Sequence, residues 1–270
     1  MRGLAILVAL LLAGCHHPEP EQRNGYRVDH RFAAQGARPR VKVLVIHYTA
    51  EDFPASLSTL TAQEVSAHYL IPQHPRDGTL WQLVPESELA WHAGPSFWRG
   101  ATRINDTSIG IELVNPGYRQ TLTGLRWAPF SPEQIAVLEA LLKDAARRYR
   151  IAPENIVGHS DIAPQRKQDP GPLFPWKQLA QAGIGAWPEA QRVRQRLAGR
   201  APDQPVDTAT LLALLRRYGY AVTPAMTPRE QQKAIAAFQM HFRPADYRGL
   251  ADAETEAIAQ ALLDKYGAAF

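Results

Sequence analysis

The stretch VKVLVIH, Val41 to His47, decides the fold class of this chain. Its positions are apolar almost throughout and rich in β-branched residues, which predicts a strand buried on both faces in the middle of a sheet. The stretch SIGIELV, Ser108 to Val114, places larger apolar side chains on one face and Gly110 and Glu112 on the other, the alternation of a second interior strand. NIVGH, Asn155 to His159, predicts a third, short strand farther along the chain.

Signals for helices lie between these strands. Ser131-Pro132-Glu133-Gln134 supplies an N-cap, a proline at the first helical position and a capping glutamine, and the apolar stripe that follows continues to Tyr149. Thr61 to Glu64 has the pattern of a capping box and predicts the start of a short helix ahead of a strand over His68 to Ile71. This order of elements predicts an α/β domain over residues 37–187, built on a central mixed β-sheet flanked by helices.

The composition changes after this domain. Residues 188–206 are charged and contain proline and glycine, which predicts a linker. Residues 207–270 contain three amphipathic segments whose apolar residues are mainly Leu, Ile and Phe. They predict a small C-terminal domain of three helices, over Asp207–Tyr218, Thr227–Phe242 and Asp252–Tyr266.

The N-terminus has the features of a secretory signal. One arginine precedes an apolar run, Leu4 to Leu12, that is too short to span a membrane as a mature helix. LLAGC, Leu11 to Cys15, resembles the bacterial lipobox, in which the cysteine is lipidated, and His16 in place of aspartate then points to the periplasmic face of the outer membrane. We expect a lipoprotein signal over residues 1–15 and a membrane tether over 16–36. The alternative is a plain signal peptide with an incidental cysteine.

The charge balance argues against one class of partner. The formal net charge of +4 is small for 270 residues, and no block of Lys and Arg interleaved with aromatic residues occurs. Nucleic-acid binding is therefore not expected. The single cysteine, Cys15, also excludes an internal disulfide.

Three residues at strand ends and in a loop form a possible metal-binding set. His47 and His159 each close a predicted strand, and Asp169 follows in a proline-rich loop. Two neutral imidazoles and one carboxylate can hold a hydrolytic zinc ion and leave one position open for water. A histidine at a strand end is, however, more often a packing or hydrogen-bonding residue, so spacing alone leaves both interpretations open.

Several ordered blocks between Val41 and Trp176 resemble one family, the type 2 N-acetylmuramoyl-L-alanine amidases, which share their fold with peptidoglycan recognition proteins. The blocks are VLVIHYTA, SAHYLI, DGTLWQLVPE, AWHAG, NDTSIGIELVN and GHSDIAPQRKQDPGPLFPW. The resemblance implies that His47, His159 and Asp169 bind Zn²⁺ and that Glu112 activates the zinc-bound water. The residues agree for Glu112, because a carboxylate on such an apolar strand is costly unless it is paired or faces a site.

The resemblance also suggests residues that act on the substrate. Lys167 lies two residues before Asp169, so in an extended segment both side chains leave on the same side, and Lys167 could stabilise a developing oxyanion. His92 and Trp91, in AWHAG, are expected near the substrate groove as contacts to peptide or glycan.

The expected activity is zinc-dependent hydrolysis of the amide bond between N-acetylmuramic acid and L-alanine, in peptidoglycan or muropeptides, for wall turnover or recycling. The C-terminal helices resemble the three-helix peptidoglycan-binding domain of wall hydrolases, although a bundle that only packs against the catalytic domain would use the same apolar residues. Two further alternatives remain: an envelope lipoprotein that binds peptidoglycan without cleaving it, and one that only tethers membrane to wall.

Overall fold

The computed structural model describes residues 19–32, 34–62, 64–122 and 124–269. The chain divides into two compact units, Met1–Arg38 and Pro39–Phe270. Within the predicted tether, the described residues of the first unit include a short antiparallel hairpin of β1 (Glu21–Arg23) and β2 (Tyr26–Val28). The predicted signal segment, with Cys15, lies outside the described residues.

The described residues of the second unit form a five-stranded sheet in the order β5-β4-β6-β3-β9. β3 (Val43–Tyr48) lies between β6 (Ser108–Leu113) and β9 (Ile156–Gly158) and is parallel to both. β4 (Tyr69–Ile71) is parallel to β6, whereas β5 (Trp81–Gln82) is antiparallel to β4. The sheet is therefore mixed, and the strand at Val43–Tyr48 lies in its interior, as the sequence predicted.

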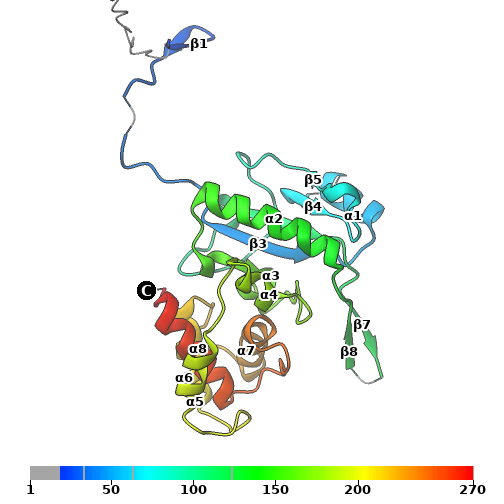
Figure 1. Ribbon diagram of the computed structural model, residues 1–270, viewed down its shortest axis with the longest axis vertical. Coiled ribbons are helices and arrows are strands. Elements are labelled where there is room, and N and C mark those ends of the chain that lie inside the picture. The colour runs from blue at the N-terminus through cyan, green and yellow to red at the C-terminus, as the bar shows by residue number, and fades with distance from the viewer. Residues whose placement is uncertain (1–18, 33, 63, 123, 270) are drawn as a thin grey trace, which may run out of the picture. The chain divides into compact units, whose positions relative to one another are not determined.

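Helices lie on both sides of this sheet. Figure 1 shows α2 along β3, while α6, α7 and α8 gather in one group beside α3 and α4. A separate hairpin, β7 (Tyr118–Thr121) and β8 (Gly124–Trp127), extends from the sheet layer. Single 3-10 turns occur at Arg76–Gly78, Ile104–Thr107 and Pro153–Asn155. The helices are α1 (Phe53–Ala62), α2 (Pro132–Tyr149), α3 (His159–Ile162), α4 (Trp176–Gln181), α5 (Ala190–Leu197), α6 (Thr208–Tyr218), α7 (Pro228–Phe242) and α8 (Ala253–Tyr266).

The alternation of residues along β3 gives the sheet two different faces. Leu44 and Ile46 belong to a core cluster with the apolar stripe of α2. Val43 and Val45 belong to another cluster that includes residues of α6, α7 and α8. His47 has the parity of Val43 and Val45, so its side chain leaves on the face that the C-terminal helices cover. His47, a predicted metal ligand, therefore lies on the side of the sheet where α6, α7 and α8 pack.

The start of α1 differs from the prediction. The helix begins at Phe53, and Asp52 caps it, because Ala55 N donates a hydrogen bond to Asp52 Oδ1 (3.0 Å). Thr61 lies at the end of the helix instead, and its Oγ1 donates to Leu57 O (2.7 Å). Asp52 is followed by Pro54 in the first turn, so the sequence contains a helix start signal upstream of the capping box at Thr61 to Glu64.

The start of α2 is confirmed, but Gln134 has another role. Ser131 Oγ accepts a hydrogen bond from Gln134 N (3.1 Å), and Pro132 is the first helical residue. The Gln134 side chain does not cap; its Nε2 donates to Ile71 O and Val114 O, each at 3.1 Å. Gln134 thereby ties α2 to the carboxyl ends of β4 and β6.

The stretches predicted as a catalytic domain and a C-terminal domain lie together in the unit Pro39–Phe270. One apolar cluster contains Val45 and Val157 of the sheet together with Leu215 of α6 and Phe238 of α7. The helices therefore share a core with the sheet. Whether they also bind peptidoglycan stays a prediction.

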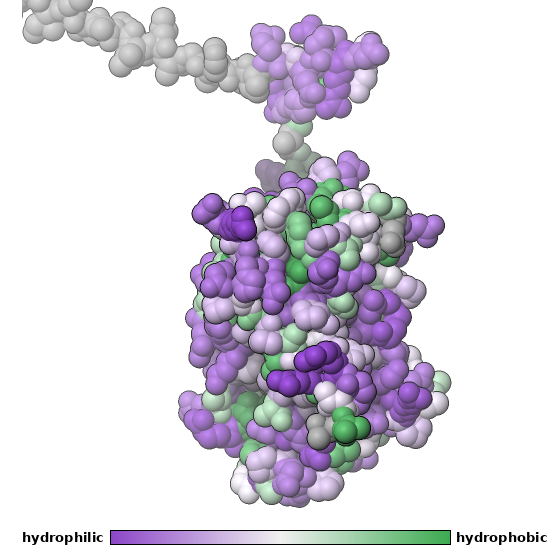
Figure 2. Space-filling model, turned by 90° about the vertical axis from the view of Figure 1, so that its right-hand side faces the viewer, coloured by the Kyte–Doolittle hydropathy of each residue, from purple (hydrophilic) through white to green (hydrophobic). Residues whose placement is uncertain are grey.

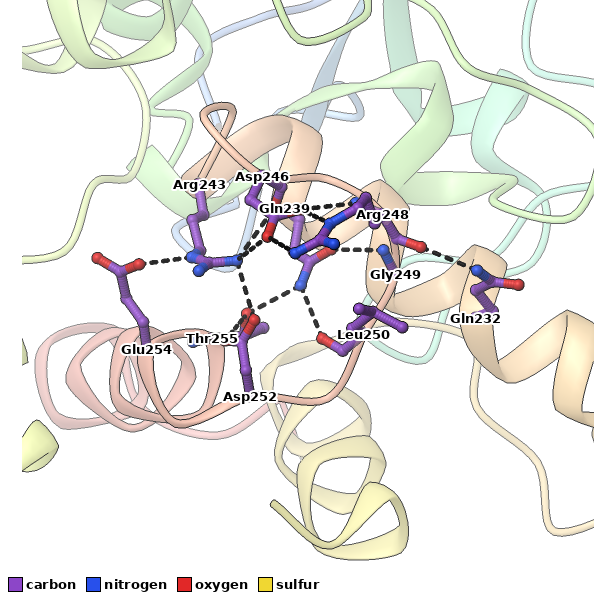
Figure 3. A network of polar contacts seen from close by, with 10 residues as sticks. All are labelled: Gln232, Gln239, Arg243, Asp246, Arg248, Gly249, Leu250, Asp252, Glu254 and Thr255. Atoms are coloured by element: carbon purple, nitrogen blue, oxygen red, sulfur yellow. Dashed lines mark hydrogen bonds and ion pairs between the residues drawn. The ribbon is translucent and has the colours of Figure 1, made fainter. Parts of the chain in front are cut away.

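A network of polar contacts holds the segment between α7 and α8 (Figure 3). Arg243 donates to Glu254 Oε2 (2.6 Å) and pairs with Asp252 Oδ2 (3.0 Å), across the start of α8. Gln239 Oε1 accepts from Gly249 N (2.8 Å). These contacts fix the end of α7 against the beginning of α8.

The face of the molecule in Figure 2 is mainly hydrophilic, with apolar residues in small separate groups. Among the residues that the structure describes, no helix combines the length and the hydropathy needed to cross a membrane. Exposed large apolar side chains include Trp91 and Leu122, but most large apolar side chains of the described chain lie in the core.

Candidate active site

The side chains of the three predicted metal ligands meet at one point. His47 lies near the carboxyl end of β3, and His159 directly follows β9, so the two parallel strands bring them together. Asp169 comes from the loop after α3. His47 Nδ1 is 2.9 Å from His159 Nδ1, and Asp169 Oδ2 is 3.1 Å from each nitrogen. Within the described chain, these residues form a group that could hold a metal ion.

The size and chemistry of this group fit a divalent ion such as zinc. Tetrahedral zinc with ligand bonds of about 2.0–2.2 Å holds its donor atoms about 3.3–3.6 Å apart, slightly wider than the separations here. The three side chains are buried, with Asp169 the most exposed at 6%. Two imidazoles and one carboxylate leave a fourth position open for water.

Hydrogen bonds at the outer nitrogens orient both histidines. His159 Nε2 is 3.1 Å from Ala93 O, and since a carbonyl oxygen only accepts, Nε2 carries the hydrogen and Nδ1 presents its lone pair. His47 Nε2 is 3.0 Å from His92 Nδ1. When His47 Nδ1 is a ligand, Nε2–H donates to His92 Nδ1, and His92 Nε2–H donates to Ser108 Oγ (2.9 Å). These bonds set the tautomers that metal binding requires.

The protonation states also suit metal binding. Burial lowers the pKa of His47 to about 4, and the nearby His159 contributes in the same direction. Burial would by itself raise the pKa of Asp169, but its contacts with His159 and His47 outweigh this and hold that pKa below the ordinary value. At neutral pH His47 is therefore a neutral imidazole and Asp169 an ionised carboxylate, the forms that bind a metal ion.

Glu112 lies opposite His47 in the register of β3 and β6, on the same face of the sheet. Among the described residues its Oε2 is buried and has no hydrogen-bond partner. Burial raises the pKa of Glu112 to about 8, and the charge of Asp169 adds to the effect. A carboxyl group with one buried, unpartnered oxygen beside a possible metal site is a candidate general base, because a cation bound there would favour its ionised form.

A cavity of about 440 Å³ opens onto these groups and is lined by His47, Glu112, Lys167 and Trp91, among others. The charge of Lys167 opposes the rise in the pKa of Glu112, which places the two groups within electrostatic reach. Trp91 is 61% exposed and offers an aromatic surface at the cavity. The cavity thus contains a possible base, a cation and an apolar surface.

His92 lines the same cavity, but its two ring nitrogens are bonded to His47 and Ser108. The sequence predicts His92 only as a contact to substrate, and nothing next to His92 in the chain indicates that it bonds to His47. Gly110 in the middle of β6 is a sequence signal for this arrangement. A side chain at position 110 would overlap the His92 ring, and the glycine leaves room for that ring. Contact between His92 and substrate stays a prediction.

Helix α7 also reaches the cavity, through Lys233, Ala236 and Met240. Tyr118, at the base of the β7–β8 hairpin, lines it as well. These residues could not be predicted from the sequence, because nothing in the local pattern of α7 distinguishes a residue that faces the cavity from one that faces solvent. The site is therefore built from both stretches that the sequence suggested were separate domains.

Comparison with known proteins identifies the family. Residues 37–172 match the family Amidase_2, described as N-acetylmuramoyl-L-alanine amidase. The chain belongs to this family. It is 63% identical to the N-acetylmuramoyl-L-alanine amidase AmiD of Escherichia coli (strain K12) over 267 residues, 97% of each chain.

Solved structures agree with this membership of the amidase family. The chain is similar to E. coli AmiD in complex with the substrate anhydro-N-acetylmuramic acid-L-Ala-D-gamma-Glu-L-Lys, with a TM-score of 0.88 and 65% identity, covering 91% of this chain and 97% of that one. It is also similar to AmpDh3 of Pseudomonas aeruginosa, with a TM-score of 0.82 and 41% identity, covering 88% and 98%. Both matches extend beyond residues 37–172, so the similarity includes C-terminal helices of this amidase.

Proposed function

We propose that this amidase hydrolyses the bond between N-acetylmuramic acid and L-alanine, with a zinc ion held by His47, His159 and Asp169. The observation that carries the proposal is the convergence of those three donors beside Glu112, whose Oε2 has no partner among the described residues. The family and the identity to AmiD support the reaction.

The chemistry follows from the groups that face the cavity. When bound, zinc supplies a water acidified toward neutral pH and a Lewis acid for the scissile carbonyl. Glu112 accepts a proton from the attacking water at a carboxylate oxygen and passes it to the nitrogen of the leaving L-alanine. Lys167 stabilises the carbonyl oxygen while it is negative. The carbon–nitrogen bond breaks, and the products are the lactyl carboxylate of the muramic acid and the free amine of the peptide.

The substrates in this proposal are muropeptides, including those with an anhydro sugar, as in the AmiD complex. Trp91 supplies an apolar contact at the cavity, and His92 contributes the edge of its ring. The cavity, with the exposed Trp91 in its lining, can accept the branched junction of sugar and peptide.

We also propose that Cys15 carries a lipid that anchors the enzyme at the periplasmic face of the outer membrane, and that residues 207–270 contribute to peptidoglycan binding. The lipobox-like sequence supports the first proposal. Fractionation tests it: the wild type should sediment with outer membrane, and Cys15→Ser should be soluble. Sedimentation with insoluble peptidoglycan tests the second.

The test of the reaction is mass spectrometry of products from a defined anhydro-muropeptide. The wild type should release the free peptide, and Glu112→Ala should retain zinc but lose activity by about 10²–10⁴-fold, because only the proton transfer is removed. Glu112→Gln is the matched control for shape. No product from zinc-loaded wild type would favour a peptidoglycan-binding protein without activity.

A further inference from the structure

Asp161 lies two residues after His159 in α3, and its carboxylate is almost completely buried, at 1% exposure. Gly158 N donates to Asp161 Oδ2 (2.7 Å), which caps α3 from within. Two further donors come from the C-terminal stretch, one from the segment after α6 and one from α7. Tyr220 Oη donates to Asp161 Oδ1 (2.5 Å), and His241 Nδ1 lies 2.7 Å from Asp161 Oδ2.

Both distant donors are buried and closely packed. Tyr220 follows α6 and is 0% exposed, in the apolar cluster that α6 and α7 share with the sheet. The His241 ring, in α7, stacks on Trp176 with centroids 3.8 Å apart. An ionised carboxylate only accepts hydrogen bonds, so His241 carries a hydrogen on Nδ1. His241 Nε2 is buried and has no partner among the described residues, so among them the imidazole makes its hydrogen bond through Nδ1, to Asp161.

The loop that leads from α3 to Asp169 has two more ties to α7. Gln165 Nε2 donates to Glu230 O (2.9 Å), and Lys233 Nζ donates to Gln165 O (2.7 Å). Two of the three possible metal ligands therefore lie on one segment, residues 159–169, that contacts the C-terminal helices at Asp161 and again at Gln165.

Helix α3 needs such support, because it contains only the four residues His159–Ile162. A single turn of helix has almost no stability of its own. The match to the amidase family ends at residue 172, so Tyr220 and His241 lie outside it. A role in the metal site is thus not assigned to them by family membership.

We propose that Tyr220 and His241 are positioning residues of the metal site: by holding the Asp161 carboxylate, they fix the turn that carries His159. This inference rests on the proposed function, because it takes the site of His47, His159 and Asp169 to bind zinc. It gives the C-terminal helices a role in positioning the metal site, besides any role in wall attachment.

The chain offers a matched pair of tyrosines to test this. Tyr218 is as deeply buried as Tyr220, at 1% exposure, but its hydroxyl has no partner among the described residues. Full-length Tyr220→Phe should bind zinc about tenfold more weakly than wild type in competition with a chromophoric chelator. This is the smallest loss expected for a direct partner of a metal ligand, because Tyr220 acts through Asp161. Tyr218→Phe should bind zinc as wild type does. The visible absorption of the cobalt-substituted protein should change only for Tyr220→Phe.

Two substitutions of His241 separate the hydrogen bond from the packing. His241→Phe keeps a ring that can stack on Trp176 but has no donor, whereas His241→Asn keeps a donor near the position of Nδ1 but loses the ring. Zinc affinity should fall about tenfold for His241→Phe and remain closer to wild type for His241→Asn. Thermal stability should show the opposite order, because the ring supplies the packing.

The outcomes distinguish this inference from the proposed function. If wild type binds zinc and cleaves the muropeptide but Tyr220→Phe and His241→Phe keep wild-type zinc affinity and cobalt spectra, the inference is wrong and the function stands. If zinc affinity follows thermal stability in all four variants, the role is only structural and the inference is again wrong. If wild type binds no zinc, the proposed function fails first.

Discussion

A methyl group at position 110 of β6 tests how His92 supports the metal site. A Cβ on Gly110 would lie 2.7 Å from His92 Nδ1 and closer still to two carbons of the ring. Overpacking of this kind costs about 1–3 kcal/mol of unfolding free energy. The ring must also move away from His47 Nε2, which is now 3.0 Å from His92 Nδ1. We therefore expect Gly110→Ala to lower both the stability and the zinc affinity, the latter by about 10–100-fold.

A double-mutant cycle with His92→Ala separates the two effects. Without the ring the methyl group has room, so Gly110→Ala should cost almost nothing in stability in the His92→Ala background. Zinc affinity should stay low in both proteins that lack the ring. Urea unfolding of the metal-free proteins gives the stabilities, and chelator competition gives the affinities. A double variant that binds zinc as wild type does, or a Gly110→Ala protein as stable as wild type, would contradict this role of His92.

Three other predictions concern stability. Hydrogen bonds from Arg148 lower the pKa of Glu86 to about 2, so Glu86→Gln should lower the free energy of unfolding by about 2 kcal/mol at pH 7. This loss should shrink as the pH falls below 4.5 toward 2, because the wild-type carboxylate is then protonated. Equal losses in urea unfolding at pH 7 and pH 3 would contradict the prediction. Gly249 has φ +77°, and a Cβ there would lie 2.7 Å from Gln232 Cγ and closer still to the carbonyl oxygen of Gln232. Gly249→Ala should therefore lower the melting temperature by several degrees. Gly36→Ala is the control and should leave the melting temperature unchanged, because a Cβ at Gly36 meets no atom within 4 Å. Removing zinc that is present at about 100 times its dissociation constant should lower the unfolding free energy by about 2.7 kcal/mol, seen as a lower melting temperature with chelator; an unchanged value would indicate that the folded protein does not bind the ion.

The sequence predicted the sheet well where its residues alternate. Leu44 and Ile46 pack on the α2 side, and Val43 and Val45 pack on the other side, which follows directly from the period of a strand. The spacing of His47, His159 and Asp169 left their role open, and the resemblance to the amidase family implied that they form one set; the structure brings their side chains together. The identity of the metal and the role of each residue stay predictions.

Other features could not be predicted because they depend on contacts between distant segments. Nothing near His92 in the sequence indicates that it bonds to His47, and nothing near Tyr220 or His241 points to Asp161, which is 59 and 80 residues away. The Gln134 side chain had a local role available as a cap, but its Nε2 donates instead to two backbone carbonyls at strand ends, those of Ile71 and Val114. In each case a buried polar group pairs with a residue that is distant in the sequence, so the local pattern does not reveal the contact.

The shared core of the sheet and the C-terminal helices has the same origin. Amphipathic segments such as Thr227–Phe242 predict that a helix buries one face, but not against which surface. Here α7 packs beside α3 and lines the cavity with Lys233 and Met240. A boundary drawn from composition at residues 188–206 could not show that the helices beyond it complete the site.

The central claim is that one zinc ion is bound by residues from two strand ends and a loop. Anomalous diffraction at the zinc absorption edge, from crystals of the protein grown with zinc, tests it most directly. The account predicts a single strong peak about 2.0–2.2 Å from His47 Nδ1, His159 Nδ1 and Asp169 Oδ2. A cavity without a peak, or an ion held by other side chains while these three remain unbound, would contradict it.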